Sequence, residues 1–402
     1  MGGPLDGISV LEVANWLAAP ATAALLADMG AEVVKVEPPQ GDPWRHFLAR
    51  SLGFATEFDI NYAFELDNRG KRSITLDLSK EKATEVVLGL AEKADVFITN
   101  LVPRRLERFR LRYQDLSPRN PKLIYLSFSG YGDRGPEKDR LGFDYAAFWA
   151  RSGIMSLVGE PDAPPAIQRG GMGDHTSCLA MAAGVLAALF ERERTGKGQE
   201  ICGSLLNIGL WVLGSDLQAA LIARENPARH ARTAAPMPMW NSYRTKDDKW
   251  IMLVNPSPDP YWPRVCAALE RKDLGENPEY NTIEGLMEHC QELVAQFDET
   301  FATKTKDEWG RILDENGVIW APVQEIKEVM SDPQVQANSY LTTVEHPTYG
   351  KYQTIDTPIR FRSSEVRARG PAPEIGQHTE EVLLENGYSW EEITDLRDQG
   401  VI

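Results

Sequence analysis

The first 132 residues alternate between short apolar runs and helical segments, and this alternation constrains the fold more than any other feature. ISVLEV (8–13) is a nearly continuous apolar run of strand length, and EVVKVEP (32–38) is a second strand. The helical segment between them has Pro20 near its start and Gly30 at its end. Further strands are predicted at 73–78, 95–100 and 123–132. The pattern predicts a doubly wound α/β sheet with right-handed crossovers.

Sheets of this kind bind ligands beyond the carboxyl ends of their strands. Here those ends are residues 13–17, 37–42, 100–103 and 127–132. No G-x-G-x-x-G follows the first strand, so neither NAD nor FAD is expected. TGKGQ (195–199) lacks the first glycine and the strand of a phosphate loop, and it is predicted to be a turn.

The second half of the chain changes character. Residues 175–225 are predicted to be mostly helical, and the Pro-, Arg- and Ala-rich segment 224–241 reads as a linker. A strand pair followed by three helices predicts a small α+β domain over 242–325. Residues 326–402 return to strands and close with two short helices. The predicted organisation is therefore a large α/β domain over 1–223, the linker, the small domain and this C-terminal segment.

Charge and composition exclude some partners. A net charge of −16 over 402 residues disfavours nucleic acid and anionic membranes. We expect no membrane span, and four cysteines without a C-x-x-C pair, with no signal segment, favour a cytoplasmic protein. Cations are concentrated only in 103–113, where five arginines accompany a single glutamate. This segment is either a solvated helix face or a site for an anionic small molecule.

Residues 169–189 hold one carboxylate, Asp174, between a glycine-rich turn and a run of small and apolar residues. Gly171 and Gly173 let the backbone approach a ligand closely, and the amides of a helix N-terminus stabilise anions. Asp174 is therefore either the N-cap of the helix or a reactive group at the helix N-terminus. The residues alone leave both interpretations open.

Several segments occur together in one order along the chain. They are LDNRGKRSITLDL, DVFITNLVPRRLERF, LSFSGYGDRGP, GDHTS and GQHTEEVL…ITDLRDQGVI. With the N-terminal βαβ unit, they make the chain resemble the family III CoA-transferases almost end to end. The resemblance implies an interlocked homodimer of two ring-like chains. It also implies a Rossmann-like large domain built from both chain ends, a smaller central domain, and crossing linkers near 224–241 and 325–335.

The resemblance makes Asp174 the catalytic nucleophile. In the family, the aspartate attacks an acyl-CoA thioester to give a mixed anhydride, and CoA then converts it to an aspartyl-CoA thioester. An acceptor carboxylate repeats these steps backward. The expected partners are therefore an acyl-CoA and a carboxylic acid. Coenzyme A is a substrate here, and neither a tightly bound cofactor nor a metal is expected.

Other functions use the same residues differently. The related α-methylacyl-CoA racemases pair the aspartate with a histidine in a G-H-D segment, where this chain has Gly142, Phe143 and Asp144. A phenyl ring cannot move a proton, which favours the transferase. His175, beside Asp174, leaves a racemase open and is also the candidate base of a thioester hydrolase. A non-catalytic acyl-CoA-binding protein would leave Asp174 unused.

The resemblance also assigns the binding residues. Asp144 matches an acidic position near the nucleophile, where paired carboxylates raise one pKa; alternatively it is a structural aspartate bonded to backbone. Leu17 and Ala18 line the pantetheine approach. The nucleotide contacts carried over by motif are Lys71, Asn100 and Leu101 as its frame, Arg108 as a phosphate ligand and Arg105 as a second contact.

The acyl group is expected to be bulky or aromatic. Residues 255–259, Asn-Pro-Ser-Pro-Asp, stand where formyl-CoA transferase has a tetraglycine loop. Two prolines stiffen the backbone where glycines would loosen it, which argues against formyl or oxalyl specificity. Among ten tryptophans, Trp16 follows the first strand and Trp240 stands with Met237 and Met239. Such side chains build large apolar pockets, although each alone is more typical of a core.

Overall fold

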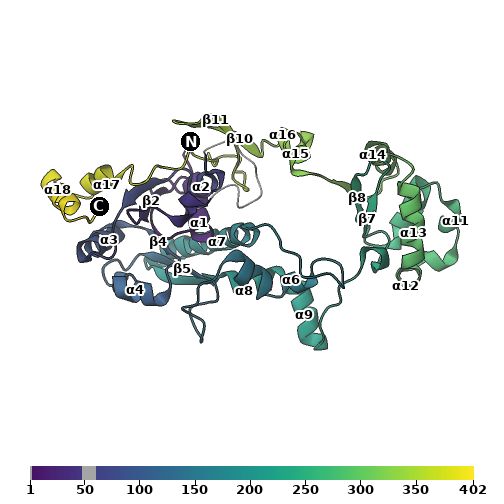
Figure 1. The fold of residues 1–402 in the computed structure, drawn as a ribbon, viewed down its shortest axis with the longest axis horizontal. Coiled ribbons are helices and arrows are strands. Elements are labelled where there is room, and N and C mark those ends of the chain that lie inside the picture. Colours follow the sequence, from purple (N-terminus) through teal and green to yellow (C-terminus); the bar gives the residue numbers. More distant parts are fainter. Residues whose placement is uncertain (1, 48–59) are drawn as a thin grey trace. The chain divides into compact units, whose positions relative to one another are not determined.

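The computed structural model describes residues 2–47 and 60–402, which divide into two compact units (Figure 1). The larger unit comprises Met1–Ser156, Ile167–Ala223 and Asn338–Ile402, and the smaller comprises Leu157–Ala166 and Arg224–Ala337. The smaller unit is larger than the small domain proposed over 242–325, because it also contains 157–166, the predicted linker 224–241 and 326–337. Each unit has its own core and is described by itself.

A six-stranded parallel sheet forms the centre of the larger unit, in the order β3-β2-β1-β4-β5-β6. The strands are β1 Ser9–Val13, β2 Glu32–Glu37, β3 Arg72–Thr75, β4 Val96–Thr99, β5 Ile124–Ser129 and β6 Gln199–Ser204. The α/β prediction is confirmed. Residues 175–225 are mostly helical, as predicted, but β6 was not predicted. This edge strand alternates between partly buried and exposed residues and lacks the apolar run of an inner strand.

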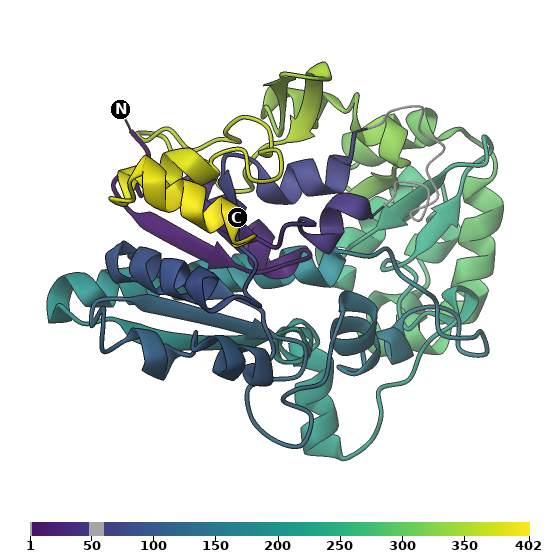
Figure 2. The same ribbon diagram turned by 60° about the vertical axis from the view of Figure 1, so that its left-hand side comes forward.

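Two layers of helices cover the sheet (Figure 2). Helices α1 (Ala18–Asp28) and α7 (Met172–Thr195) pack against each other on one face. Every residue of α1 is buried, and its many alanines allow close packing. A second core contains residues of the sheet and of α3 Glu81–Lys93, α4 Pro103–Phe109, α5 Tyr113–Leu116, α17 Thr379–Glu385 and α18 Trp390–Asp398. The chain end therefore completes the core that the N-terminal half begins.

One helix of the described residues, α7, is long and apolar enough to cross a membrane by length and composition alone. The pair α8 (Leu205–Val212) and α9 (Gly214–Ala223) passes the same test only together, across a bend of 78°. Helix α7 packs on α1 and on strands β5 and β6, which is the place of a core helix in an α/β unit. Its apolar composition is accounted for by that packing.

Shorter elements complete the larger unit. They are η1 Pro43–His46, α2 Tyr62–Asn68, the π-helical η3 Asp144–Ala150, α6 Ile154–Leu157, and the antiparallel hairpin of β10 Leu341–His346 with β11 Gly350–Ile355. Of these, η1, α2 and η3 hold residues of the candidate site.

The smaller unit is an α+β fold. Its antiparallel sheet has the order β7 Ser242–Arg244, β8 Trp250–Leu253, β9 Trp320–Val323. Its helices include α10 Pro258–Ala268, α11 Lys272–Gly275, α12 Ile283–Glu288, α13 Cys290–Phe301 and α14 Lys306–Glu315, around a core with Trp262, Phe297, Phe301 and Trp309. Residues 326–337, predicted as strands, form α15 Ile326–Val329 and α16 Pro333–Ala337 instead. Asp332 starts α16 by accepting hydrogen bonds from the amides of Gln334 and Val335.

Candidate active site

A cavity of about 340 Å³ lies in the larger unit, where the sheet changes winding direction between β1 and β4. Doubly wound sheets bind ligands at this place, beyond the carboxyl ends of their strands. Its walls come from the β1–α1 turn, the β4–α4 turn, the end of β5, segment 138–143 and the start of α7. The lining residues are Asn15, Trp16, Leu17, Ala18, Asn100, Val102, Arg104, Arg105, Phe128, Ser129, Gly130, Lys138, Arg140, Leu141, Gly142, Phe143, Asp174 and Leu205.

Asp174 lies in the first turn of α7, and its side chain lines the cavity. The N-cap is Gly171, whose φ of +87° is a left-handed conformation that favours glycine. The interpretation of Asp174 as the N-cap is therefore wrong. Its position near the amide end of the helix still suits an anion, because the helix dipole is positive there.

Asp144 approaches α7 from η3 and is 5% exposed. Its Oδ2 accepts a hydrogen bond of 2.7 Å from the Gly171 amide, while Oδ1 has no hydrogen-bond partner among the described residues. A Cβ on Gly173 would lie 2.2 Å from that Oδ1, so only glycine lets the helix come this close. Asp144 is thus bonded to backbone and also adds a second carboxylate beside Asp174.

Burial and this second carboxylate change the acidity of Asp174. Burial is the largest cause and the charge of Asp144 the next, and together they raise the pKa of Asp174 to about 7, against a lowering effect of His175. A carboxyl group with this pKa exists in both forms near neutral pH. A perturbed acid lining a cavity is a candidate functional group.

The β1–α1 turn forms the wall at Leu17 and Ala18, and two side chains hold it in place. The Asn100 amide group accepts from the Asn15 N–H (3.0 Å) and donates to the Asn15 carbonyl (2.6 Å). Trp16 has a φ of +69°, a conformation that costs a non-glycine residue about 1–3 kcal/mol. Its N–H donates to Asp42 Oδ1 at 2.9 Å, which supports this conformation.

Aromatic side chains and cations give the cavity two different sides. The Trp16 and Phe143 rings meet edge to face at 5.1 Å. Four cationic side chains also line the cavity: Arg104, Arg105, Lys138 and Arg140. In a chain of net charge −16, this concentration of positive charge favours a ligand with both an anionic and an apolar part.

His175 points from α7 to α2. Its Nε2 lies 2.9 Å from Asp67 Oδ1, and Asp67 Oδ2 accepts a hydrogen bond of 2.9 Å from the Trp44 indole. Burial disfavours the charged imidazole, but the hydrogen bond and charge of Asp67 outweigh burial and raise the pKa of His175. The Asp67 carboxylate therefore favours the charged form of the imidazole at the start of α7.

Comparison with known proteins decides the family. The sequence model of CoA-transferase family III matches residues 5–379. The chain belongs to CoA-transferase family III. A (R)-2-hydroxy-4-methylpentanoate CoA-transferase of Clostridioides difficile is 33% identical over 398 residues, 99% of this chain and 99% of that protein. A cinnamoyl-CoA:phenyllactate CoA-transferase of Clostridium sporogenes is 35% identical over 393 residues, 97% and 95% of the two chains.

A solved structure agrees with this assignment. A CAIB/BAIF family protein from Brucella suis has a TM-score of 0.84 and 29% identity, covering 96% of this chain and 100% of that one. The prediction of a family III CoA-transferase, an enzyme that moves CoA between acyl thioesters and carboxylates, is thereby confirmed.

The CoA-transferase cavity brings together five of the residues predicted from the sequence. They are Leu17, Ala18, Asn100, Arg105 and Asp174, with Asp144 directly behind Asp174. Leu101 and Arg108 are not part of the lining: Leu101 packs against the core, and Arg108 is an exposed residue of α4 over the Phe109 ring. Arg104 belongs to the arginine-rich segment 103–113 that was considered as a site for an anionic ligand, whereas Lys138, Arg140 and Asp67 were not predicted.

Lys71 has a different place from the one predicted. Its Nζ is fully buried, 2.7 Å from Glu12 Oε2, and donates to the Pro20 carbonyl and to Asn68 Oδ1. Burial is the largest cause that lowers the pKa of Lys71 to about 8. With these contacts made inside the unit, Lys71 does not frame a nucleotide in this cavity.

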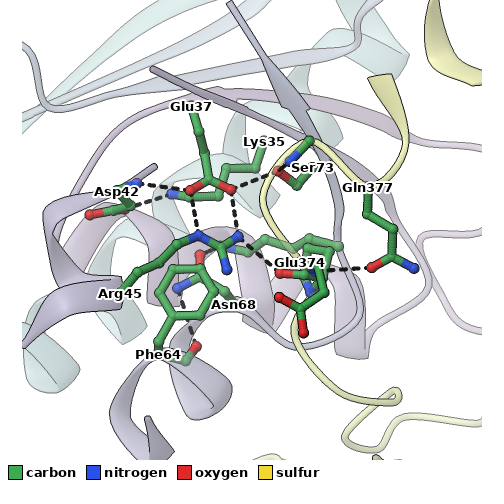
Figure 3. Close-up of polar contacts among 12 residues, drawn as sticks. Lys35, Glu37, Asp42, Arg45, Phe64, Asn68, Ser73, Glu374 and Gln377 are labelled. Carbon is green, nitrogen blue, oxygen red and sulfur yellow. Dashed lines mark hydrogen bonds and ion pairs between the residues drawn. The ribbon is translucent and has the colours of Figure 1, made fainter. Parts of the chain in front are cut away.

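Lys71 shares Glu12 with Lys35, which belongs to a buried charge network with Asp42, Glu37 and Arg45. Figure 3 shows Lys35, Asp42, Glu37 and Arg45. Lys35 Nζ lies 2.6 Å from Glu12 Oε1 and 2.9 Å from Asp42 Oδ2. Glu37 accepts a hydrogen bond from the Asp42 amide and binds Arg45 through both oxygens at 2.7 Å. Because Asp42 also accepts a hydrogen bond from the Trp16 amide, the network connects the sheet interior to the cavity wall.

Some of the predicted acyl-group contacts belong to the smaller unit. Met239 is buried in the core of that unit, and Trp240 is exposed on it. In segment 255–259, Asn255 is buried and exchanges hydrogen bonds with the backbone of Ile319, at 2.9 and 3.1 Å. This segment is thus fixed at its first residue. Among the described residues, no group of three or more His, Cys, Asp and Glu side chains is arranged to hold a metal ion.

Proposed function

We propose that this CoA-transferase exchanges CoA between carboxylic acids with bulky branched or aromatic side chains, using Asp174 as a covalent nucleophile. The observation that carries the proposal is the Asp174 carboxylate in a cavity with aromatic and cationic parts. The aromatic wall is the Trp16–Phe143 pair. The cationic rim consists of Arg104, Arg105, Lys138 and Arg140. Two relatives of nearly full length are named for 2-hydroxy-4-methylpentanoate and phenyllactate, which are 2-hydroxy acids of this kind. The Trp16–Phe143 pair offers apolar surface for such side chains.

The covalent route needs no outside reactant. An Asp174 oxygen attacks the thioester carbonyl and expels CoA thiolate, leaving a mixed anhydride. The thiolate attacks the aspartyl carbonyl, so the donor acid leaves with that oxygen and an aspartyl-CoA thioester remains. The acceptor carboxylate attacks this thioester and again expels CoA thiolate. Attack of the thiolate on the acceptor carbonyl then gives the new acyl-CoA and restores the Asp174 carboxylate.

Phe143 supports a transferase over a racemase. It lies in the cavity lining and packs against Trp16, in the place where a racemase of this superfamily would have its histidine. A second proton-transferring group would have to be His175, whose Nε2 is already bound to Asp67. The described lining contains no histidine, which supports a nucleophile's role for Asp174 over a proton-transferring one.

The function is tested by supplying acyl-CoAs together with carboxylic acids and following all thioesters by liquid chromatography. We expect phenyllactate or 2-hydroxy-4-methylpentanoate to gain CoA as the donor loses it, and formate and oxalate to remain unchanged. Free CoA that accumulates without an acceptor would indicate a hydrolase. Loss of α-deuterium from a 2-methylacyl-CoA without transfer would indicate a racemase.

The cationic rim is proposed to bind the phosphates of CoA. Arg105→Met should raise the KM for acyl-CoA about tenfold with little change in kcat, because a hydrogen-bonded charge pair is lost equally from ground and transition states. Arg108→Met is the matched control on the same helix, outside the lining, and should change KM less than twofold. Steady-state kinetics of both variants measure this, and equal effects would contradict the assignment.

We also propose a homodimer, interlocked as in the family. Helix α9 has no buried residue, and Trp211 on α8 and Ile222 on α9 are 84% and 76% exposed. Apolar side chains so exposed are typical of an interface with another chain, here a second copy. Sedimentation equilibrium should give the dimer mass, and Trp211→Glu with Ile222→Glu should weaken it. A monomer at micromolar concentration would contradict the proposal.

A further inference from the structure

Asp67 and His175 form a pair at the start of α7 that the covalent route above does not use. We propose that Asp67 is a positioning residue that fixes the His175 imidazole as a cation beside Asp174, and that this cation favours the ionised, nucleophilic form of Asp174. The inference rests on the proposed function, because it concerns how readily Asp174 attacks. It adds two residues, one of them far from the catalytic motif in sequence, to the reaction.

The geometry of the pair is fixed from both sides. Asp67 is 1% exposed, and its two oxygens are both engaged, Oδ1 by His175 Nε2 and Oδ2 by the Trp44 indole, each at 2.9 Å. The Trp44 amide in turn donates to Asp42 Oδ1 at 2.9 Å. Asp67 is therefore anchored to the buried charge network, and the imidazole has a defined orientation.

The hydrogen bond on Nε2 has a chemical consequence. A carboxylate accepts only, so Nε2 must carry the proton. The second nitrogen, Nδ1, lies on the side of Gly171, 3.7 Å from where a Cβ would stand on that residue. A proton on Nδ1 makes the ring a cation next to Asp174, and the Asp67 charge stabilises that form.

Three carboxylates of the described residues act on the charge of His175. Asp67 approaches from α2, Asp144 from η3 and Asp174 from α7, and each favours the cation, whereas burial opposes it. The Cys178 thiol, one turn along α7, donates to the His175 carbonyl at 3.0 Å. The net result is a raised pKa for His175.

Asp67 and Asp144, which favour the charged form of His175, favour the neutral form of Asp174. Burial, Asp144 and Asp67 each raise the pKa of Asp174, while His175 lowers it. The attacking form is the carboxylate, so the rate of acylation rises as pH increases through the Asp174 pKa of about 7. Without the His175 cation, that pKa rises further and less carboxylate is present at neutral pH.

His175→Gln tests the inference through the pH profile of kcat/KM for the acyl-CoA. The His175 side chain is 44% exposed, so this change should preserve the fold. We expect the acidic limb of the profile to move up by about one pH unit, which lowers kcat/KM up to about tenfold at pH 6. The difference from wild type should shrink above pH 9, where Asp174 is ionised in both proteins.

Two further variants separate charge from structure. Asp144→Asn removes a carboxylate that raises the Asp174 pKa, so its acidic limb should move down, opposite to His175→Gln. Asp67→Asn removes the partner of His175 but also a charge that raises the Asp174 pKa, so its limb should move up less than in His175→Gln. A merely structural role would lower kcat/KM by one factor at every pH.

The outcomes distinguish this inference from the proposed function. If wild type transfers CoA but the acidic limb of His175→Gln stays in place, the inference is wrong and the covalent route stands. An equal loss of rate at every pH in His175→Gln would also overturn it. If wild type neither transfers CoA nor becomes acylated at any pH, the proposed function itself fails.

Discussion

Asp174→Asn should lower the kcat of CoA transfer at least about 10³-fold, because an amide cannot form the mixed anhydride. The substitution is nearly isosteric, and Asp174 makes no side-chain hydrogen bond among the described residues that its loss would break. The larger unit should therefore keep its fold. Transfer rates at saturating acyl-CoA and acceptor measure the effect.

Asp144→Asn is the control for this prediction. It changes a carboxylate in the same cluster, and its amide oxygen can still accept from the Gly171 N–H. Because Asp144 does not form the covalent bond in the proposed route, this variant should keep far more activity than Asp174→Asn. Transfer by Asp174→Asn within tenfold of wild type, or equal losses in both variants, would contradict the nucleophile assignment.

Lys35→Met should lower the free energy of unfolding of the larger unit by about 3–5 kcal/mol. The Lys35 side chain is fully buried between Glu12 and Asp42. Methionine fills similar space but leaves two buried carboxylates short of a cation, and such carboxylates are costly. Hydrogen exchange of the β1 and β2 amides measures the loss in this unit without interference from the smaller one.

Arg119→Met serves as the stability control. Arg119 forms an ion pair of 2.6 Å with Glu92 in the same unit, but both side chains are about half exposed. Exposed pairs contribute at most about 1 kcal/mol, so the exchange rates of β1 and β2 should change little. If Lys35→Met and Arg119→Met had equal effects, the buried network would not have the stabilising role assigned to it.

The parallel sheet could be predicted because its inner strands are buried on both faces. That burial demands runs such as ISVLEV, which are readable without knowing any contact. Strand β6 was not predicted because it is an edge strand, in which partly buried and exposed residues alternate. Residues 326–337 were predicted as strands from a short apolar pattern. In the structure, the Asp332 side chain accepts hydrogen bonds from the backbone and favours a helix over that pattern.

The cavity could be predicted where a residue's neighbours in sequence determine its place. Leu17, Ala18, Asn100 and Asp174 directly follow strands or begin a helix, so the topology alone carries them to one edge of the sheet. The prediction for Lys71 was wrong because its ion-pair partner, Glu12, lies on another strand and is not apparent from the local sequence. The pairing of Asp67 with His175 also depends on tertiary packing, and no local sequence pattern predicts it.

The central claim is that Asp174 loses an oxygen atom to the donor acid and gains one from the acceptor acid during transfer. A single turnover with an acceptor labelled with ¹⁸O in its carboxylate, followed by proteolysis and peptide mass spectrometry, tests it directly. The covalent route predicts one ¹⁸O atom in the peptide that contains Asp174 and none elsewhere. Formation of the new acyl-CoA with no ¹⁸O in that peptide would contradict the account.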